Sequence, residues 1–156
     1  MRLFKRCLPK EKKELFKTVL NEIQKDSRFR ECSQYMMHGK TSVRQHCIKV
    51  AYTALFISYK FYVKVDERQL IRGALLHDYF LYDWHEKSLK NSIHGFTHGS
   101  TALKEAKKDF NLSATERDMI KHHMFPLTPT APRSCEGFIL CIADKVCAVS
   151  ETIHRK

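Results

Sequence analysis

Residues 66–78 read DERQLIRGALLHD, and this stretch decides the predicted fold class. Asp66 is a residue type that caps helices, and the apolar residues after it recur at helical spacing. The predicted helix ends in the adjacent pair His77-Asp78. A buried, ionised carboxylate beside an apolar helix is costly unless a cation or a partner compensates it, and the C-terminal end of the helix dipole adds to the cost. Because a metal ion would remove both penalties, the stretch predicts a helical protein with a metal ligand at Asp78.

Helical spacing also dominates the rest of the chain. Five further helices are predicted. The first starts just after Pro9, and the second runs from the caps Thr41 and Ser42 to about Phe61. The others run from His98 to near Phe110, from the capping box at Ser113 to His123, and from about Ser134 to Glu151. Strand patterns are nearly absent. We therefore predict an all-α protein, a single compact bundle of about six to seven helices.

The length of 156 residues is most simply one domain over residues 1–156. We expect residues 1–38 to form an N-terminal helix and lead-in, and residues 39–151 to form a metal-binding helical core. No apolar run approaches the roughly 20 residues of a membrane span, and the basic start lacks the apolar stretch of a signal peptide. We therefore expect a cytoplasmic protein whose six cysteines are reduced and structural.

Histidines and aspartates recur at or near the ends of these predicted helices. Asp144 would carry the same cost of burial as Asp78, because it follows the apolar run 139–143 and Val146 lies just beyond it. Imidazole nitrogens and carboxylate oxygens together suit divalent transition metals. We expect one or two ions, iron or manganese first, with zinc, cobalt, nickel or magnesium as alternatives. The candidate metal ligands are His46, His77, Asp78, His98, His122, His123 and Asp144.

Helix geometry suggests how these ligands divide between two ions. Neighbouring side chains on a helix diverge by about 100°, so His77 and Asp78 cannot take equivalent places around one ion. Asp78 has two oxygens and is the natural bridge between two ions. His123 can join the second ion only if its helix frays before Pro126; otherwise it contacts a ligand or the substrate. We expect one site from His46, His77, Asp78 and Asp144, and a second from His98, His122 and the other oxygen of Asp78.

This pattern resembles the HD-domain superfamily of helical metal-dependent phosphohydrolases. The resemblance runs from about Gly39 to Glu151 and implies hydrolysis of phosphate mono- or diesters, often in nucleotides. The adjacent histidines are similar to those of subgroups with two metals, where both members can be ligands. The resemblance rests on His46 followed by Val50-Ala51, on Ala74-Leu75-Leu76-His77-Asp78, on His98-Gly99 followed by Ala102, on His122-His123, and on Ala143-Asp144-Lys145.

One position departs from a common form of the family motif. Tyr79-Phe80 follows the His-Asp pair, where many members have Ile-Gly. A tyrosine there resembles a branch that acts on dinucleoside polyphosphates, yet that branch usually lacks the His-His pair. The resemblance therefore implies a nucleotide or a dinucleotide as substrate and leaves the two open.

The formal charge of +11 is the second informative number. A basic excess raises the local concentration of anions, and the positive residues are scattered without the aromatic interleaving that single-stranded nucleic acid needs. We therefore expect a small, phosphate-bearing substrate rather than nucleic acid. Lys145 and Arg133 are candidates to hold its phosphate, Lys as a point charge and Arg as a fork. With Asp78, they are the predicted catalytic residues.

Three further histidines fall in predicted loops near the ligand segments. His38, His85 and His94 could each carry a proton to a leaving group, since imidazole titrates near neutral pH. A solvated loop histidine is the simpler interpretation of each. His94 is the alternative ligand if His98 does not bind metal.

Two other functions fit the same residues. A small branch of the superfamily consists of di-iron oxygenases, and ligand identity does not separate these from hydrolases because histidine and carboxylate suit both. A non-catalytic module could also keep the metals for stability or for sensing a nucleotide. An iron-dependent electronic signal would favour the oxygenase, metal-activated phosphodiester cleavage the hydrolase, and tight binding without turnover the module.

Overall fold

A computed structural model of the chain describes residues 8–25, 27–38, 41–79 and 94–153. Within these residues the protein is helical, apart from a two-stranded antiparallel sheet. The predicted all-α class is confirmed. The elements are α1 (Lys10–Lys25), the 3-10 helix η1 (Arg28–Gln34), β1 (Met36–His38), β2 (Thr41–Ser42), α2 (Val43–Lys60), α3 (Glu67–Leu76), α5 (His94–Asp109), α6 (Ala114–His122) and α7 (Cys135–Ile153).

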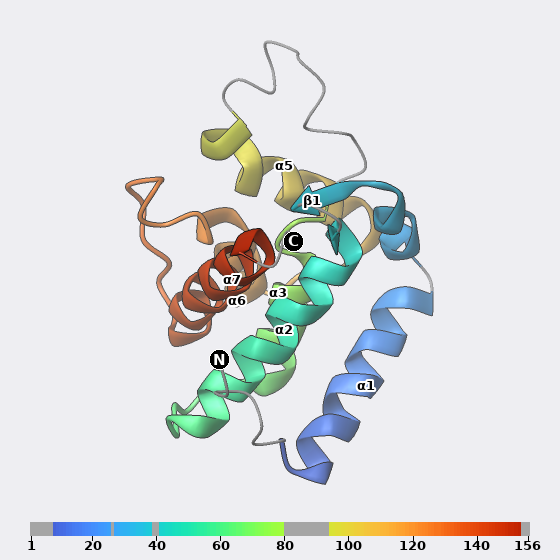
Figure 1. Cartoon of the computed structure of the whole chain (residues 1–156), viewed down its shortest axis with the longest axis vertical. Helices are drawn as coiled ribbons and strands as arrows, with labels where there is room; N and C mark the ends of the chain where they lie inside the picture. Colours follow the sequence, from blue (N-terminus) through green and yellow to red (C-terminus); the bar gives the residue numbers. More distant parts are fainter. Residues whose placement is uncertain (1–7, 26, 39–40, 80–93, 154–156) are drawn as a thin grey trace.

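Helix α2 runs through the middle of the molecule, with α1 on one side and α7 on the other (Figure 1). It packs mainly against α3 and α7, and α6 packs in turn against α3, α5 and α7. Small and branched residues of α2, such as Val50, Ala51 and Ala54, are fully buried, so neighbouring helices approach it on more than one face. The core continues through Leu75 of α3 and Ile120 of α6.

Side-chain caps fix the beginnings of three helices. Ser42 accepts a hydrogen bond from the backbone of Gln45, whose side chain accepts from the backbone of Ser42 in return. Ser113 and Glu116 form the same capping box on α6, and Asp66 accepts from the Gln69 backbone at the start of α3. Capping satisfies N–H groups that have no partner inside the helix. The predicted starts of α2, α3 and α6 are confirmed.

Other boundaries differ from the prediction. Helix α5 begins at His94, one turn before His98, so His98 lies within the helix rather than at its opening. Gly95 and Thr97 are weak helix formers in that first turn, which is why the sequence did not indicate it. The 3-10 helix η1 was not predicted either; Ser27 caps it, and Phe29 and Cys32 anchor it in the core.

Five cysteines lie in the described residues, and all five are free thiols. Cys32, Cys47, Cys141 and Cys147 are buried and pack as small apolar side chains, whereas Cys135 is exposed at the start of α7. Cys7 lies outside the described residues. None of the helices in the described ranges is long and apolar enough to cross a membrane.

Candidate metal centre

Six of the predicted ligands converge in one buried cluster, which we call the His/Asp cluster. Five helices contribute to it. His77 and His123 occupy the C-terminal caps of α3 and α6, so both lie where a helix ends and its last side chains can turn inward. All members are buried except Asp144, whose side chain is 13% exposed. The members are His46 (α2), His77 and Asp78 (the end of α3), His98 (α5), His123 (the end of α6) and Asp144 (α7).

The two cap histidines are oriented by their own helices. Nδ1 of His77 lies 2.7 Å from the Ala74 carbonyl oxygen, and Nδ1 of His123 lies 2.8 Å from that of Ile120. A carbonyl oxygen only accepts, so Nδ1 of each ring carries the proton and donates it. When the ring is neutral, Nε2 therefore keeps its lone pair and directs it into the cluster, as metal-binding histidines require.

Asp78 lies at the middle of the cluster, and its two oxygens face different histidines. Oδ2 is 3.3 Å from Nε2 of His77 and 3.7 Å from Nε2 of His46. Oδ1 is 3.3 Å from Nε2 of His123 and is paired with Nε2 of His98. One carboxylate therefore connects two separate pairs of imidazoles.

Asp144 approaches the first of these pairs from α7. Its Oδ1 is 3.1 Å from Nε2 of His46 and 3.7 Å from Nε2 of His77. Two triads have donor atoms that all lie within 4.8 Å of one another: His46, His77 and Asp144, and His77, Asp78 and His123. This spacing is short enough for one cation to contact all three members of a triad.

Electrostatics in the cluster hold both carboxylates ionised. Burial alone would raise the pKa of Asp78, but the neighbouring His77 and His98 hold it well below its usual range. Burial acts in the same direction on Asp144, but its hydrogen bond with His46 and the nearby ring of His77 hold its pKa far below the ordinary value. The cluster therefore presents two negative charges that need positive compensation.

The imidazoles respond to these carboxylates unequally. Burial lowers the pKa of His46, yet its hydrogen bonds with Asp144 and Glu151 outweigh this and raise the pKa to about 10. For His77, too, burial is outweighed, here by the charge of Asp78, and the pKa lies well above its ordinary value. Burial prevails at His123, whose pKa is lowered. Protons and divalent cations compete for the same nitrogens, so metal binding would release these protons.

The donor set fits divalent transition metals. Nε2 of His77 is buried and makes no hydrogen bond with the described residues, although it lies between two carboxylates. A buried polar atom without a partner is uncommon and indicates a missing ligand such as water or an ion. A set of imidazole nitrogens and carboxylate oxygens without thiolates matches iron, manganese, cobalt or zinc.

His122 lies outside the cluster, which differs from the expected arrangement. Its Nδ1 donates to Oδ1 of Asp118, one turn earlier in α6, at 2.9 Å. The side chain of His122 is 16% exposed, and that of His123 is 1% exposed. Adjacent positions diverge by about 100°, so only one of the two can face Asp78 from the end of α6, and that one is His123.

The two predicted phosphate contacts have different locations. Nζ of Lys145 donates to the His123 carbonyl oxygen at 3.1 Å and lies 3.9 Å from Oδ2 of Asp144, which places its charge at the edge of the cluster. Arg133 is exposed, and its backbone N–H donates to Oδ2 of Asp118 at 2.7 Å. Arg133 and His122 therefore meet at Asp118.

Four of the predicted residues lie outside the described residues or are described by their backbone alone. His85 and Phe80 lie outside the described residues, and for His38 and His94 only the backbone is described. Tyr79 is described and fully buried. Its hydroxyl donates to Asp109 at 2.6 Å, and its ring stacks on that of Phe29, so it joins η1 to α5.

Sequence reasoning missed two acidic residues. Oε2 of Glu151 accepts from Nδ1 of His46 at 2.9 Å, and Asp118 holds His122 as described above. Spacing could have indicated both. Glu151 follows Asp144 by two helical turns and shares its face of α7, and Asp118 precedes His122 by one turn.

A separate apolar groove lies between α1, α2 and α7. Its volume is about 590 Å³, and its walls include Phe16, Ile48, Tyr52 and Val146. None of its lining residues belongs to the His/Asp cluster. The groove is therefore distinct from the candidate metal centre.

Comparison with known proteins identifies a family. The family model described as "HD domain" matches residues 43–149, which is more than half of the chain. The matched range includes every member of the His/Asp cluster. No curated protein and no solved structure matches the chain.

Proposed function

The chain belongs to the HD domain family, and from this premise we propose that it is a metal-dependent phosphohydrolase that cleaves a phosphate mono- or diester. A nucleotide or dinucleotide is the proposed substrate. The observation that carries the proposal is the position of Asp78, whose two oxygens face two pairs of histidines. A single carboxylate between two sets of nitrogen donors is suited to bridging two ions.

We assign the ligands of two ions on this basis. His46, His77, Asp144 and Oδ2 of Asp78 would hold the first ion. His98, His123 and Oδ1 of Asp78 would hold the second. Iron or manganese is the proposed metal, because the donors are nitrogen and oxygen without sulfur. Ions bound there would supply acidified water and charge neutralisation of phosphoryl oxygens.

The rest of the reaction falls to the protein's own side chains. Phosphoryl transfer needs chiefly positioning and positive charge. Lys145, whose side chain is 43% exposed beside Asp144, is the proposed contact for a phosphate oxygen. Arg133 and His122, which meet at Asp118, are candidates for a second contact and for proton transfer to the leaving group. The formal charge of +11 favours the approach of an anionic substrate.

The test is reconstitution of purified, chelator-treated protein with manganese, iron(II), cobalt or magnesium. Each sample is assayed on a generic phosphomonoester and phosphodiester, and then on nucleotides and dinucleotides. We expect hydrolysis that depends on a transition metal, with the ester cleaved and phosphate-bearing products released. Asp78→Asn, which keeps the shape of the side chain and removes its charge, should abolish activity.

Two outcomes would contradict the proposal in different ways. Iron-dependent consumption of dioxygen without ester cleavage would assign the oxygenase chemistry instead. Tight binding of a nucleotide by the metal-loaded protein, with no turnover of any ester, would assign a sensing module. A Lys145→Met variant with an unchanged KM would remove Lys145 from the substrate site.

A further inference from the structure

His46 differs from the other oriented histidines of the cluster in how its ring is held. His77 and His123 lie at helix ends, where each donates from Nδ1 to a carbonyl oxygen of its own last turn. His46 lies within α2, where the backbone carbonyls are already used by the helix. Its Nδ1 therefore needs an acceptor from another element.

Glu151 of α7 is that acceptor. Its Oε2 lies 2.9 Å from Nδ1 of His46, although the two residues are 105 positions apart. On the opposite side of the ring, Oδ1 of Asp144 lies 3.1 Å from Nε2. Asp144 and Glu151 are two turns apart on one face of α7, so a single helix holds both nitrogens of this imidazole.

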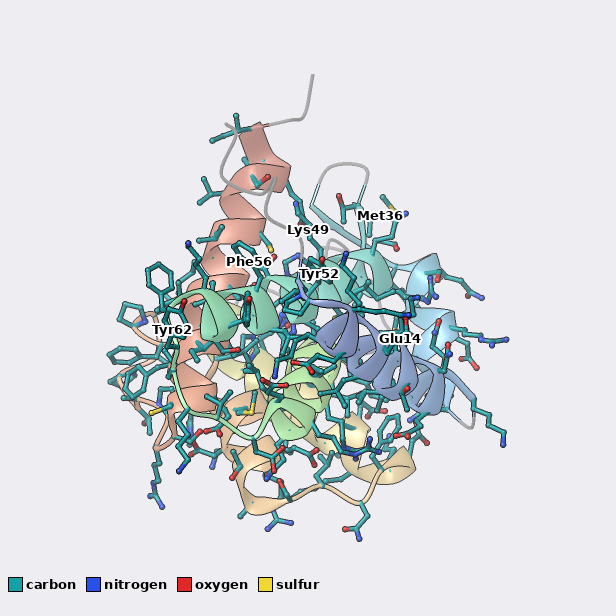
Figure 2. All side chains as sticks on the ribbon, turned by 90° about the horizontal axis from the view of Figure 1, so that it is seen from below. Glu14, Met36, Lys49, Tyr52, Phe56 and Tyr62 are labelled. Carbon is teal, nitrogen blue, oxygen red and sulfur yellow. The ribbon has the colours of Figure 1, made fainter. Side chains whose placement is uncertain are left out.

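The second oxygen of Glu151 is also held. Oε1 lies 3.2 Å from Nζ of Lys49, which follows His46 by one turn of α2. Figure 2 places Lys49 at the boundary between α2 and α7. The Glu151 side chain is 4% exposed, while that of Lys49 is 43% exposed. With one oxygen on His46 and the other on Lys49, the Glu151 carboxylate is fixed behind the ring.

We propose that Glu151 is a positioning residue that fixes the Nδ1-protonated tautomer of His46 and aims its Nε2 at the first ion. This rests on the metal centre proposed above. Partners of this kind orient metal-binding histidines, and their loss costs typically about 10–100-fold in metal affinity. Of the proposed metal ligands, Glu151 is hydrogen-bonded to His46, which belongs to the first ion. Removing Glu151 should therefore lower the affinity for the first ion and leave the affinity for the second ion, which His98 and His123 hold, unchanged.

The experiment compares Glu151→Ala and Glu151→Gln with the unmodified chain by calorimetric titration with Mn²⁺ and Co²⁺. We expect Glu151→Ala to weaken one of two binding events by about 10–100-fold. Glu151→Gln should weaken it less, since the amide oxygen still accepts from Nδ1. In the protein loaded with diamagnetic Zn²⁺, ¹⁵N NMR should show the proton of the His46 ring on Nδ1, held in its hydrogen bond to Glu151, and an exchange-broadened Nδ1–H signal in Glu151→Ala.

Glu116 supplies a matched control. Its side chain is 3% exposed, against 4% for Glu151; it is bonded to Arg72 at 2.5 Å and to the backbone of Ser113, and among the described residues it makes no hydrogen bond to the cluster. Glu116→Gln should reduce thermal stability and leave both metal affinities unchanged. Lys49→Met should lower the affinity for the first ion less than Glu151→Ala does, because Glu151 still holds the His46 ring in the Lys49→Met variant.

The inference is overturned if Glu151→Ala binds both ions as tightly as the unmodified chain, or if both affinities fall together in Glu151→Gln with a normal circular dichroism spectrum. It is separable from the proposed function. A chain that binds two ions but hydrolyses no ester refutes the proposed reaction and leaves the Glu151 result interpretable, whereas a chain that binds no metal refutes both.

Discussion

The adjacent histidines at the end of α6 have distinct surroundings. His123 places Nε2 at 3.3 Å from Asp78, whereas His122 donates to Asp118. Substituting each in turn therefore compares two neighbouring sites with the same chemical change. The difference in metal binding reports which side chain faces the ions.

His123→Ala should lower the affinity of the second ion by more than about tenfold, because it removes a proposed ligand and not merely a ligand's partner. His122→Ala should leave metal stoichiometry unchanged and should reduce only the rate of ester cleavage. Metal analysis after gel filtration distinguishes the two variants. Loss of metal in His122→Ala with retention in His123→Ala would reverse the assignment.

Cys32 gives a pH-dependent prediction away from the metal centre. Burial raises the pKa of this thiol from 9.0 to about 12. The folded state therefore keeps the proton more tightly than the unfolded state does. The contribution of the protonated Cys32 thiol to the free energy of unfolding is fully present below pH 9, and it is lost as the pH rises from 9 toward 12.

Denaturant unfolding between pH 8 and pH 11, with a chelator present, measures the effect. The free energy of unfolding of the unmodified chain should fall more steeply with pH than that of Cys32→Ala. Identical slopes for the two proteins would show that the buried thiol does not contribute.

Several site residues were predictable from the sequence for physical reasons. Asp78 and Asp144 stand out as acids in apolar helices. We expected His122 rather than His123 at the second ion, although His123 is the one that shares a face of α6 with the buried Glu116, Met119 and Ile120. The direction of each Asp78 oxygen was not predictable. It depends on how α2, α5 and α6 pack around the end of α3, which no local pattern encodes.

At the scale of elements, the close approach of α5 to α6 brings His98 next to His123. Gly99 makes the approach feasible, since a Cβ at this position would overlap the carbonyl oxygens of Ile120 and Lys121. Gly73 of α3 is also tightly packed, but a Cβ there would meet the flexible end of the Met119 side chain, 2.6 Å away.

Gly99→Ala and Gly73→Ala therefore form a matched pair. Replacing glycine by alanine within a helix favours the helical state by about 1 kcal/mol in both variants. The new methyl group of Gly99→Ala must also displace the α6 backbone, so this variant should have a lower melting temperature and a lower affinity for the second ion. Gly73→Ala should have a smaller effect on both, because Met119 can move. Calorimetry and metal titration of the two variants test this; equal effects would contradict the proposed role of Gly99.

The local sequence predicts the helices whose first turns are capped by their own side chains. It does not predict the elements that tertiary contacts hold in place. Ser42, Asp66 and Ser113 identify helix starts because each side chain bonds to its own first turn. The 3-10 helix η1 instead depends on distant partners: Phe29 stacks on Tyr79, and Arg28 pairs with Asp109 at 2.9 Å. Such contacts leave no signature within η1 itself.

At the scale of the whole molecule, the His/Asp cluster joins five helices that are far apart in the sequence. Residues of α2, α3, α5, α6 and α7 surround two ionised carboxylates. Ions that bind there should connect these helices and oppose unfolding, because the unfolded chain does not assemble the site.

Added Mn²⁺ should therefore raise the free energy of unfolding, by about 2.7 kcal/mol when free metal is about 100 times its dissociation constant. A chelator should reverse the effect. Asp144→Asn, which keeps the size of the side chain and removes its charge, should respond much less. Differential scanning calorimetry measures each change, and an equal response of Asp144→Asn would place the stabilising ion elsewhere.

The central claim is that Asp78 and Asp144 bind ions together with His46, His77, His98 and His123. Anomalous diffraction at the manganese edge, from crystals grown with Mn²⁺, tests it most directly. We expect strong peaks about 2 Å from these nitrogens and oxygens, with Asp78 between two of them. Peaks confined to the molecular surface, with Nε2 of His77 and the Asp78 carboxylate contacting no ion, would contradict it.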